Sequence, residues 1–131
     1  KGNWEISNPK GFKASIGNKD ISIIQGLADH VALFEGYFDF LSWRKLNSSA
    51  VPPTAIVLNS VSLVKKAVEY MKNIKIIDLY LDNDVVGHQC AATVKESYPY
   101  ANDRSAVYAG YKDFNDMLMV SLKNSYSRKN R

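Results

Sequence analysis

Hydrophobic and polar residues alternate within the first 25 positions, and this pattern predicts short β-strands. Residues 4–7 and residues 12–16 each alternate apolar and polar side chains, and a turn containing Pro and Gly separates them. Two alternating runs around such a turn are typical of a β-hairpin. The pattern at residues 21–25, after a second turn, predicts one more short strand. We therefore expect residues 1–28 to form a small N-terminal segment that contains a β-hairpin.

From residue 31 onward the pattern changes to short apolar runs that alternate with segments of helical spacing. The apolar runs are continuous, as in strands that are buried on both faces. The intervening segments repeat apolar residues at intervals of three and four, as amphipathic helices do. We expect strands at residues 31–34, 55–58, 75–81 and 105–109, each followed by a helix, with the last two helices at residues 85–97 and 116–123.

This order of strands and helices predicts an α/β fold with a sheet of about four mostly parallel strands and helices on both faces. We assign residues 29–120 to this domain. Residues 121–131 carry four basic side chains among Ser and Asn, and we expect them to form a flexible, basic tail. In sheets of this kind the functional residues gather beyond the carboxyl ends of the strands.

Length and composition limit the class of protein. The chain has 131 residues, enough for one domain with its own core, and its formal net charge of +4 is permissive for nucleic-acid binding. Its one cysteine excludes an internal disulfide framework and suits the reducing cytoplasm, where we expect the protein to act without a membrane partner. Because the sequence starts at Lys1 rather than Met, we expect neighbouring domains to be missing.

Acidic residues follow three of the predicted strands. Glu35 comes after the first, Asp82 and Asp84 come after the third, and Asp113 follows the fourth. The carboxyl ends of parallel strands meet at one edge of a sheet, so we expect these carboxylates to lie close together, where they repel one another unless a cation is bound. Oxygen ligands without His or Cys favour Mg²⁺ or Mn²⁺ over zinc. The pattern therefore predicts a divalent-metal site.

Each acidic group also has a simpler interpretation. Asp82-Asn83-Asp84 is a common sequence for a turn followed by a helix N-cap, and the acids near residue 116 suit the start of a helix. Glu35 stands alone after an apolar strand, where burial can raise its pKa towards general acid or base use, or where a neighbouring Lys or Arg can pair with it. It is the placement at three strand ends that favours a shared metal site.

Two motifs in these positions resemble the Toprim domain, in particular that of bacterial primases. They are Glu35-Gly36-Tyr37-Phe38-Asp39, which is similar to Glu-Gly-Tyr-x-Asp, and the segment at 82–87, which is similar to Asp-x-Asp-x-x-Gly. The resemblance covers residues 29–119 and extends to Toprim-like domains of primase or mobilization proteins carried by Bacteroides-type mobile elements. It implies a Toprim fold and Mg²⁺-dependent phosphoryl transfer on nucleic acid.

The resemblance also implies roles for single residues. Glu35 matches the glutamate that acts as general acid or base, and Asp82 and Asp84 match the metal-binding aspartates. Asp39 matches a further acid of the primase motif. Asp113 falls in a late acidic motif, usually Asp-Pro-Asp, in which this chain has Phe114 and Asn115 at the second and third positions. Asn83 replaces the Gly that is common between the paired aspartates.

The same resemblance implies nucleic acid as the partner. We expect Arg44, Lys45 and Lys112 to contact a backbone, with single-stranded DNA as template, nucleotides as substrates, and a helicase or relaxase as a further protein partner. No tyrosine is marked as a nucleophile, so we do not expect a topoisomerase.

Four functions remain open at this point. The first is a primase-like nucleotidyltransferase, whose activity we expect to be weak in this chain alone. The second is a Toprim nuclease, and the third is a non-catalytic module that binds nucleic acid. The fourth is an unrelated phosphoaspartate enzyme with Asp82 as its nucleophile, for which Ser105 and Lys112 are poor partners.

Overall fold

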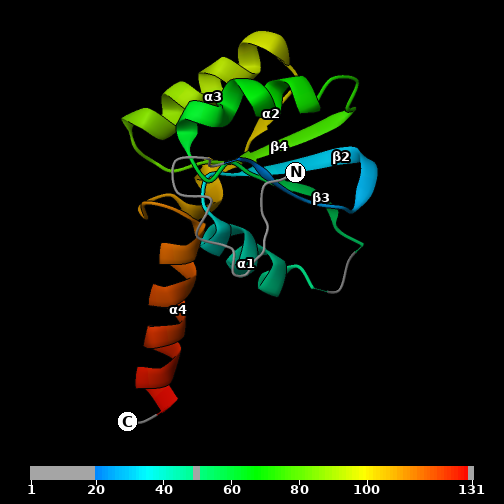
Figure 1. Cartoon of the computed structure of the whole chain (residues 1–131). Helices are drawn as coiled ribbons and strands as arrows, with labels where there is room; N and C mark the ends of the chain where they lie inside the picture. The colour runs from blue at the N-terminus through cyan, green and yellow to red at the C-terminus, as the bar shows by residue number, and fades with distance from the viewer. Residues whose placement is uncertain (1–19, 49–50, 130–131) are drawn as a thin grey trace, which may run out of the picture.

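The structure is a computed structural model that describes residues 20–48 and 51–129. Within them, a five-stranded sheet has the order β1-β3-β2-β4-β5 (Figure 1). The strands are β1 (Ser22–Ile24), β2 (Leu27–Phe34), β3 (Pro53–Val57), β4 (Ile76–Tyr80) and β5 (Asn102–Asp103). β2 pairs in parallel with β3 and β4, β4 pairs in parallel with β5, and β1 is antiparallel to β3. The predicted α/β fold with a mostly parallel sheet is confirmed.

The strand count and the last strand differ from the prediction. The sheet has five strands because β1 joins it beside β3. A strand was predicted at residues 105–109. Residues 105–108 instead form the 3-10 helix η3 (Ser105–Tyr108), and the last strand, β5, lies just before them. In this segment Tyr108 is buried, whereas Ala106 and Val107 are exposed, so the segment lacks the two buried faces of a central strand. The predicted hairpin at residues 4–16 lies outside the described residues.

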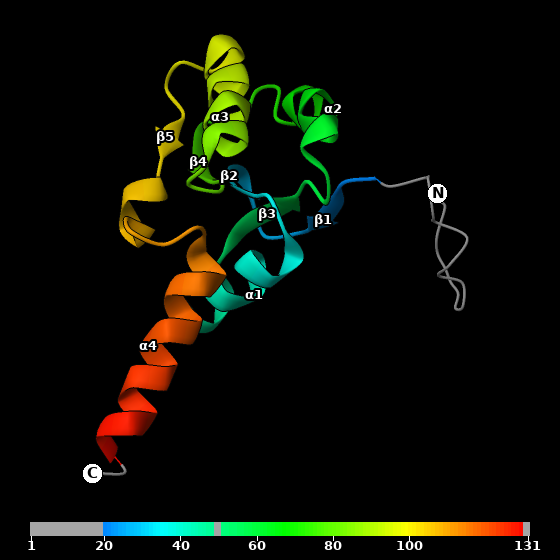
Figure 2. The same cartoon turned by 90° about the vertical axis from the view of Figure 1, so that its left-hand side faces the viewer.

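Helices cover both faces of the sheet, as Figures 1 and 2 show. On one face lie α2 (Val64–Tyr70) and α3 (Val85–Ser97), preceded by the 3-10 helix η2 (Val61–Leu63). On the other lie α1 (Tyr37–Leu46) and the start of α4 (Phe114–Lys129). Alternate residues of β2 therefore serve different cores: Val31 and Leu33 pack with α2 and α3, whereas Ala32 and Phe34 pack with α1 and α4.

The last helix is longer than the sequence pattern indicates. We predicted a helix at residues 116–123 and a flexible, basic tail at residues 121–131. In the structure, α4 continues to Lys129 and projects away from the sheet (Figure 2). Leu118 is its last buried residue, and every residue from 121 to 128 is exposed. None of the helices within the described residues is long and apolar enough to cross a membrane.

A buried carboxylate ties the edge strand to the centre of the sheet. Asp78 on β4 accepts hydrogen bonds from His30 on β2 (2.7 Å), from Asn102 on β5 (3.1 Å) and from the Nε of Arg104 (3.1 Å). Burial alone raises the pKa of Asp78, but these hydrogen bonds together hold it below its usual value. The network lies on the face of Ala32 and Phe34 and holds β5 in place.

Candidate metal centre

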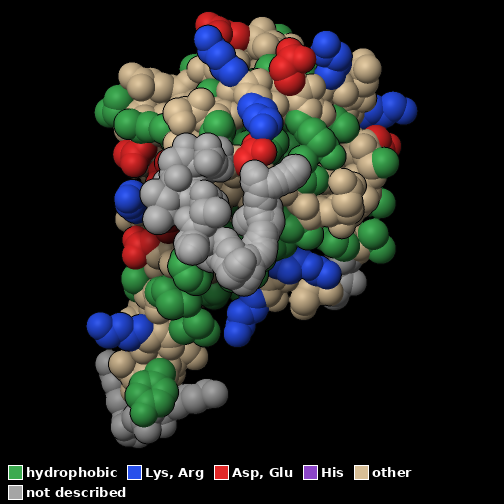
Figure 3. All heavy atoms as spheres, in the orientation of Figure 1, with side chains coloured by type: hydrophobic (Ala, Val, Ile, Leu, Met, Phe, Trp, Pro, Cys, Tyr) green, Lys and Arg blue, Asp and Glu red, His purple; other side chains and the backbone are tan. Residues whose placement is uncertain are grey.

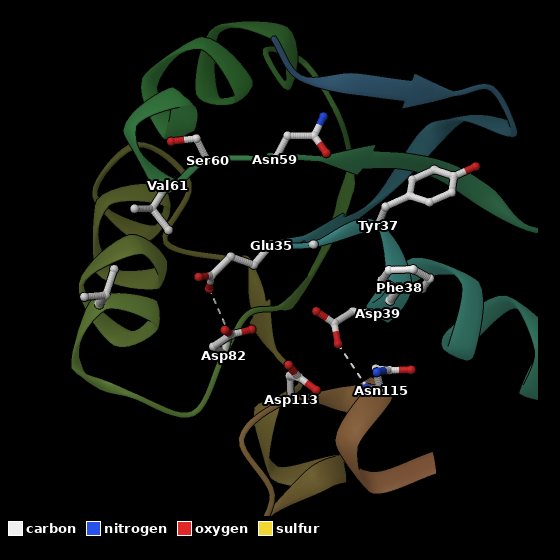
Figure 4. Close-up of a pocket in the computed structure, with 12 residues that line it drawn as sticks. Glu35, Tyr37, Phe38, Asp39, Asn59, Ser60, Val61, Asp82, Asp113 and Asn115 are labelled. Atoms are coloured by element: carbon white, nitrogen blue, oxygen red, sulfur yellow. Dashed lines mark hydrogen bonds between the residues drawn. The ribbon is translucent and has the colours of Figure 1, made fainter. Parts of the chain in front are cut away.

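Carboxylates from three separate elements meet beyond the carboxyl ends of the parallel strands. Asp82 follows β4, Asp39 lies in the first turn of α1, and Asp113 immediately precedes α4. One oxygen of each lies within 4.8 Å of the others (Figure 4). We call these three residues the acid cluster. They are the residues among the described ranges that could hold a metal ion together.

Hydrogen bonds fix the acid cluster to its surroundings. The backbone N–H of Asn115 donates to Oδ1 of Asp39 at 3.0 Å, which joins the start of α4 to α1. The side chain of Asn115 in turn accepts a hydrogen bond from the hydroxyl of Ser42 at 2.8 Å. The carboxylate of Asp113 accepts from the N–H of Asp116 at 2.8 Å and so caps the first turn of α4.

Glu35 stands beside the cluster at the end of β2. Its Oε1 accepts a hydrogen bond from the backbone N–H of Asp82 at 3.1 Å, so that the glutamate and the aspartate lie together (Figure 4). Burial raises the pKa of Glu35, this hydrogen bond lowers it, and the negative charges of Asp84 and Asp113 raise it further; the net result is a raised pKa. Glu35 can therefore hold or release a proton closer to neutral pH than an exposed glutamate.

The aspartates repel one another in the metal-free protein. Burial and the negative charges of neighbouring carboxylates raise the pKa of Asp82 to about 7. Burial and, to a smaller extent, the charge of Asp113 raise the pKa of Asp39 to about 6, although the N–H of Asn115 opposes the shift. Carboxylates this close repel one another when they are all ionised. A bound cation offsets that repulsion and stabilises their ionised forms.

One buried oxygen tests whether a divalent cation fits. Oδ1 of Asp82 is shielded from solvent and has no hydrogen-bond partner among the residues that the structure describes. A buried acceptor without a donor is costly, and a cation removes that cost. Carboxylate oxygens are the ligands that Mg²⁺ and Mn²⁺ prefer. The acid cluster therefore fits such an ion.

The fourth predicted metal ligand, Asp84, caps a helix in this structure. Its Oδ1 accepts a hydrogen bond from the backbone N–H of Gly87 at 2.7 Å and caps the start of α3. It is not one of the three residues of the acid cluster. Gly87 is also required there, because a Cβ at this position would lie 2.0 Å from the backbone oxygen of Asp82.

The predicted nucleic-acid contacts are spread over two places. Lys112 directly precedes Asp113, is exposed, and lowers the pKa of Glu35 through its charge. Arg44 and Lys45 lie in the last turn of α1, at the opposite end of that helix from Asp39, and Nη1 of Arg44 donates to the backbone oxygen of Asn47. Only Lys112 is therefore near the acid cluster.

A cavity of about 430 Å³ opens beside the acid cluster. Its acidic half is formed by the cluster and Glu35, and its uncharged half lies towards Tyr37, Asn59 and Ser60 (Figure 4). The sequence pattern did not single out Asn59 or Ser60 as site residues, and it gave Asn115 no role beyond its place in the late acidic motif. The available signal was the position of Asn59 directly after the predicted strand at residues 55–58. In the structure its backbone is left-handed, with a φ of 66°.

Together, the fold and the acid cluster define a mostly parallel α/β domain with a candidate site for a divalent cation. The sequence pattern of one family matches residues 32–118, about two thirds of the chain. The chain belongs to this family, the Toprim-like family. The matched range includes Glu35 and all three aspartates of the acid cluster.

Two solved structures from bacteriophage T7 have a similar fold. The primase fragment of the T7 primase-helicase protein is 18% identical to the chain with a TM-score of 0.59, and the match covers 77% of this chain and 43% of the fragment. The other is a structure of the T7 lagging-strand DNA polymerase interacting with primase domains of two gp4 subunits bound to an RNA/DNA hybrid and dTTP. It is 20% identical with a TM-score of 0.58, and the match covers 76% of this chain and 52% of that one.

The chain therefore spans about half the length of the solved structures that it matches. No curated protein matches it in sequence.

Proposed function

We propose that this chain is the Mg²⁺-dependent catalytic domain of a primase-like DNA replication or mobilization protein. Its reaction is the transfer of a nucleotidyl or phosphoryl group on nucleic acid. The acid cluster carries this proposal, since three carboxylates lie within 4.8 Å and one of their buried oxygens has no hydrogen-bond partner among the described residues. Family membership and the likeness to the fold of the T7 primase fragment support it.

Asp82, Asp39 and Asp113 are the residues that would hold Mg²⁺ or Mn²⁺. Asp84, two residues after Asp82, is proposed as a further ligand. When bound, the metal neutralises negative charge on a transferring phosphate. The chain itself supplies the orientation: the hydrogen bond from Asn115 fixes Asp39, and the cap on α4 fixes Asp113.

Glu35 has the role of general acid or base. It is half-buried, its pKa is raised, and it lies against the backbone of Asp82. A carboxylate in this state can take a proton from an attacking hydroxyl or return one to a leaving oxygen.

The cavity suits a nucleotide with its phosphates towards the acid cluster and its sugar towards Asn59 and Ser60. Lys112 contacts the phosphate backbone beside the site, and Arg44 and Lys45 contact it further away. Figure 3 shows some Lys and Arg side chains near α1 and α4, and others elsewhere on the same face. The proposed partners are single-stranded DNA as template, nucleotides, and a helicase or relaxase, in the cytoplasm.

Metal binding is the first test of this proposal. We expect the chain to bind Mn²⁺, measured by electron paramagnetic resonance. Asp82→Asn should weaken binding by at least the roughly 10–100-fold that loss of an outer-shell partner costs, because it removes a ligand of the acid cluster. Glu96→Gln, which changes an exposed acid at the other end of α3, is the control and keeps the wild-type affinity. Equal binding by wild type and Asp82→Asn would contradict the proposed site.

The second test separates primase from nuclease. Labelled single-stranded DNA is incubated with nucleoside triphosphates, Mg²⁺ and the chain. New primers support the proposal, shortened DNA identifies a nuclease that uses the same acids, and retention of DNA without turnover identifies a binding module. In either enzyme Glu35→Gln should lower the rate about 100-fold or more, whereas Glu96→Gln should not. We expect primer synthesis by this chain alone to be weak.

A further inference from the structure

Asp113 reaches the acid cluster from a segment outside the sheet. Residues 104–113 connect β5 to α4 and contain η3 and a turn at Gly110, whose φ is +89°. The strands hold Asp82 through the sheet, but no strand holds Asp113. Its position therefore depends on the capped start of α4 on one side, and on the contacts that attach this segment to the end of β4 on the other.

One side-chain amide makes three of these contacts. Nδ2 of Asn83 lies 3.3 Å from the carbonyl oxygen of Ser105, 3.2 Å from that of Tyr108 and 3.0 Å from that of Tyr111. Two N–H bonds thus serve three acceptors, with at least one of them shared. The backbone N–H of Asn83 also donates to the carbonyl oxygen of Lys112 at 2.6 Å, next to Asp113.

The chemistry of this position is selective. Gly at position 83 has no side-chain donor, so it leaves three carbonyl oxygens without this partner. Asp has nearly the same size as Asn, but its carboxylate accepts hydrogen bonds and would face carbonyl oxygens. Only an amide donor of this length makes the observed contacts.

We propose that Asn83 is a positioning residue that holds Asp113 in the metal site. The inference rests on the proposed metal binding by the acid cluster. Asn83 is next to Asp82 in the chain, so it couples two carboxylates that come from different parts of the fold. Asn83 does not contact the metal. It holds the connecting segment, residues 104–113, in place through its hydrogen bonds.

The segment has a second attachment, so loss of Asn83 should loosen it without unfolding the domain. The hydroxyl of Tyr108 donates to the backbone oxygen of Leu81 at 2.6 Å, and the Tyr108 ring is buried against Phe114. The effect of a substitution at Asn83 should therefore be local.

The test compares Mn²⁺ affinity and amide hydrogen exchange in Asn83→Ala and Asn83→Asp with those of the wild type. We expect Asn83→Ala to weaken Mn²⁺ binding by roughly 10-fold or more and to speed exchange in residues 105–113 of the metal-free protein. We expect Asn83→Asp to speed the same exchange, because its carboxylate cannot donate to the three carbonyl oxygens. A negative charge alone, with the hydrogen bonds kept, would not speed exchange. The control is Asn47→Ala, which removes a comparable bond from an Asn amide to the carbonyl of Trp43 (2.9 Å) far from the site; its Mn²⁺ affinity should match the wild type.

A double-mutant cycle with Asp113→Asn decides whether Asn83 acts through Asp113. If it does, adding Asn83→Ala to Asp113→Asn weakens Mn²⁺ binding no further. Additive losses, or wild-type affinity in Asn83→Ala, would overturn the inference while leaving the metal site in place. Absence of Mn²⁺ binding by the wild type would overturn the proposed function, and with it this inference.

Discussion

At the scale of single residues, Asp82 is held in a place where its charge is unfavourable. It is half-buried among other carboxylates, and one of its oxygens has no hydrogen-bond partner among the described residues. Such a residue lowers the stability of the metal-free fold, and a bound cation reverses this effect. The arrangement is typical of functional sites, where stability is given up for chemistry.

This arrangement predicts an unusual pH dependence of stability. In the unfolded chain Asp82 and Asp39 ionise near their ordinary pKa of 3.8, but in the folded metal-free protein they keep their protons up to about pH 7 and about pH 6. The folded state therefore binds more protons between these values, and the free energy of unfolding should fall as the pH rises from about 4 to about 7. Urea denaturation in EDTA measures it.

Asp82→Asn should flatten this profile, because it removes the larger of the two shifts. Asp29→Asn, a change of the same kind at an exposed position, should leave the slope as it is. If the free energy of unfolding of the wild type rises with pH across this range, the folded state does not raise the pKa values of these carboxylates.

At the scale of elements, the short strand β5 depends on one side chain of its neighbour. β5 has two residues, both exposed, so it has little apolar packing of its own. Asp78 instead binds Asn102 within β5 and Arg104 just after it, and also binds His30 on the other side of β4. The network is therefore a structural one at the edge of the sheet, separate from the acid cluster.

Asp78→Asn should destabilise the domain by about 1–3 kcal/mol at pH 7, because it removes a charged acceptor from buried hydrogen bonds. The loss should shrink below about pH 4: the folded pKa of Asp78 is lowered, so its stabilisation is present above the unfolded pKa and is lost as the pH falls through the folded one. Chemical denaturation at both pH values checks this. A loss that stays constant down to pH 2.5 would mean that charge is not its cause.

The junction between β4 and α3 should tolerate no side chain at Gly87. A Cβ would lie 2.0 Å from the backbone oxygen of Asp82, so Gly87→Ala must move α3 away from the strand end, at a cost of about 1–3 kcal/mol or more. At Gly36 an added Cβ would meet only the Asp39 carboxylate, at 3.5 Å. Thermal unfolding of Gly36→Ala is thus the comparison; equal melting temperatures would refute the close contact.

The elements that the sequence predicts well are those with long, periodic patterns. The strands β2, β3 and β4 follow from continuous apolar runs, and α3 has the predicted bounds, with Pro99 just beyond its end. β5 could not be predicted, because Asn102-Asp103 has neither apolar character nor length. Topology brings acids of distant segments together, so their meeting was predictable. The helix cap made by Asp84 and the hydrogen bonds of Asn83 could not be predicted. They depend on the directions of single side chains, which the hydrophobic periodicity of the sequence does not determine.

At the scale of the whole molecule, α4 divides into a packed start and an exposed end. Its first residues pack against α1 and carry Phe114 and Leu118 into the core, whereas residues 121–128 are exposed. The two halves of this helix should therefore contribute very differently to stability.

Truncation after Leu122 should change the melting temperature by no more than a few degrees and leave Mn²⁺ affinity as in the wild type, because it removes no buried side chain among residues 123–128. Truncation after Phe114 should unfold the domain, since it removes Leu118 and the packing of α4 on α1. Loss of the fold in the longer variant would show that the exposed half of α4 contributes to the core.

Helices cover both faces of the sheet. Among the described residues, the cavity beside the acid cluster therefore opens at the edge where the parallel strands end. If the chain acts on nucleic acid as proposed, the reacting phosphate would reach the acid cluster over this edge of the sheet.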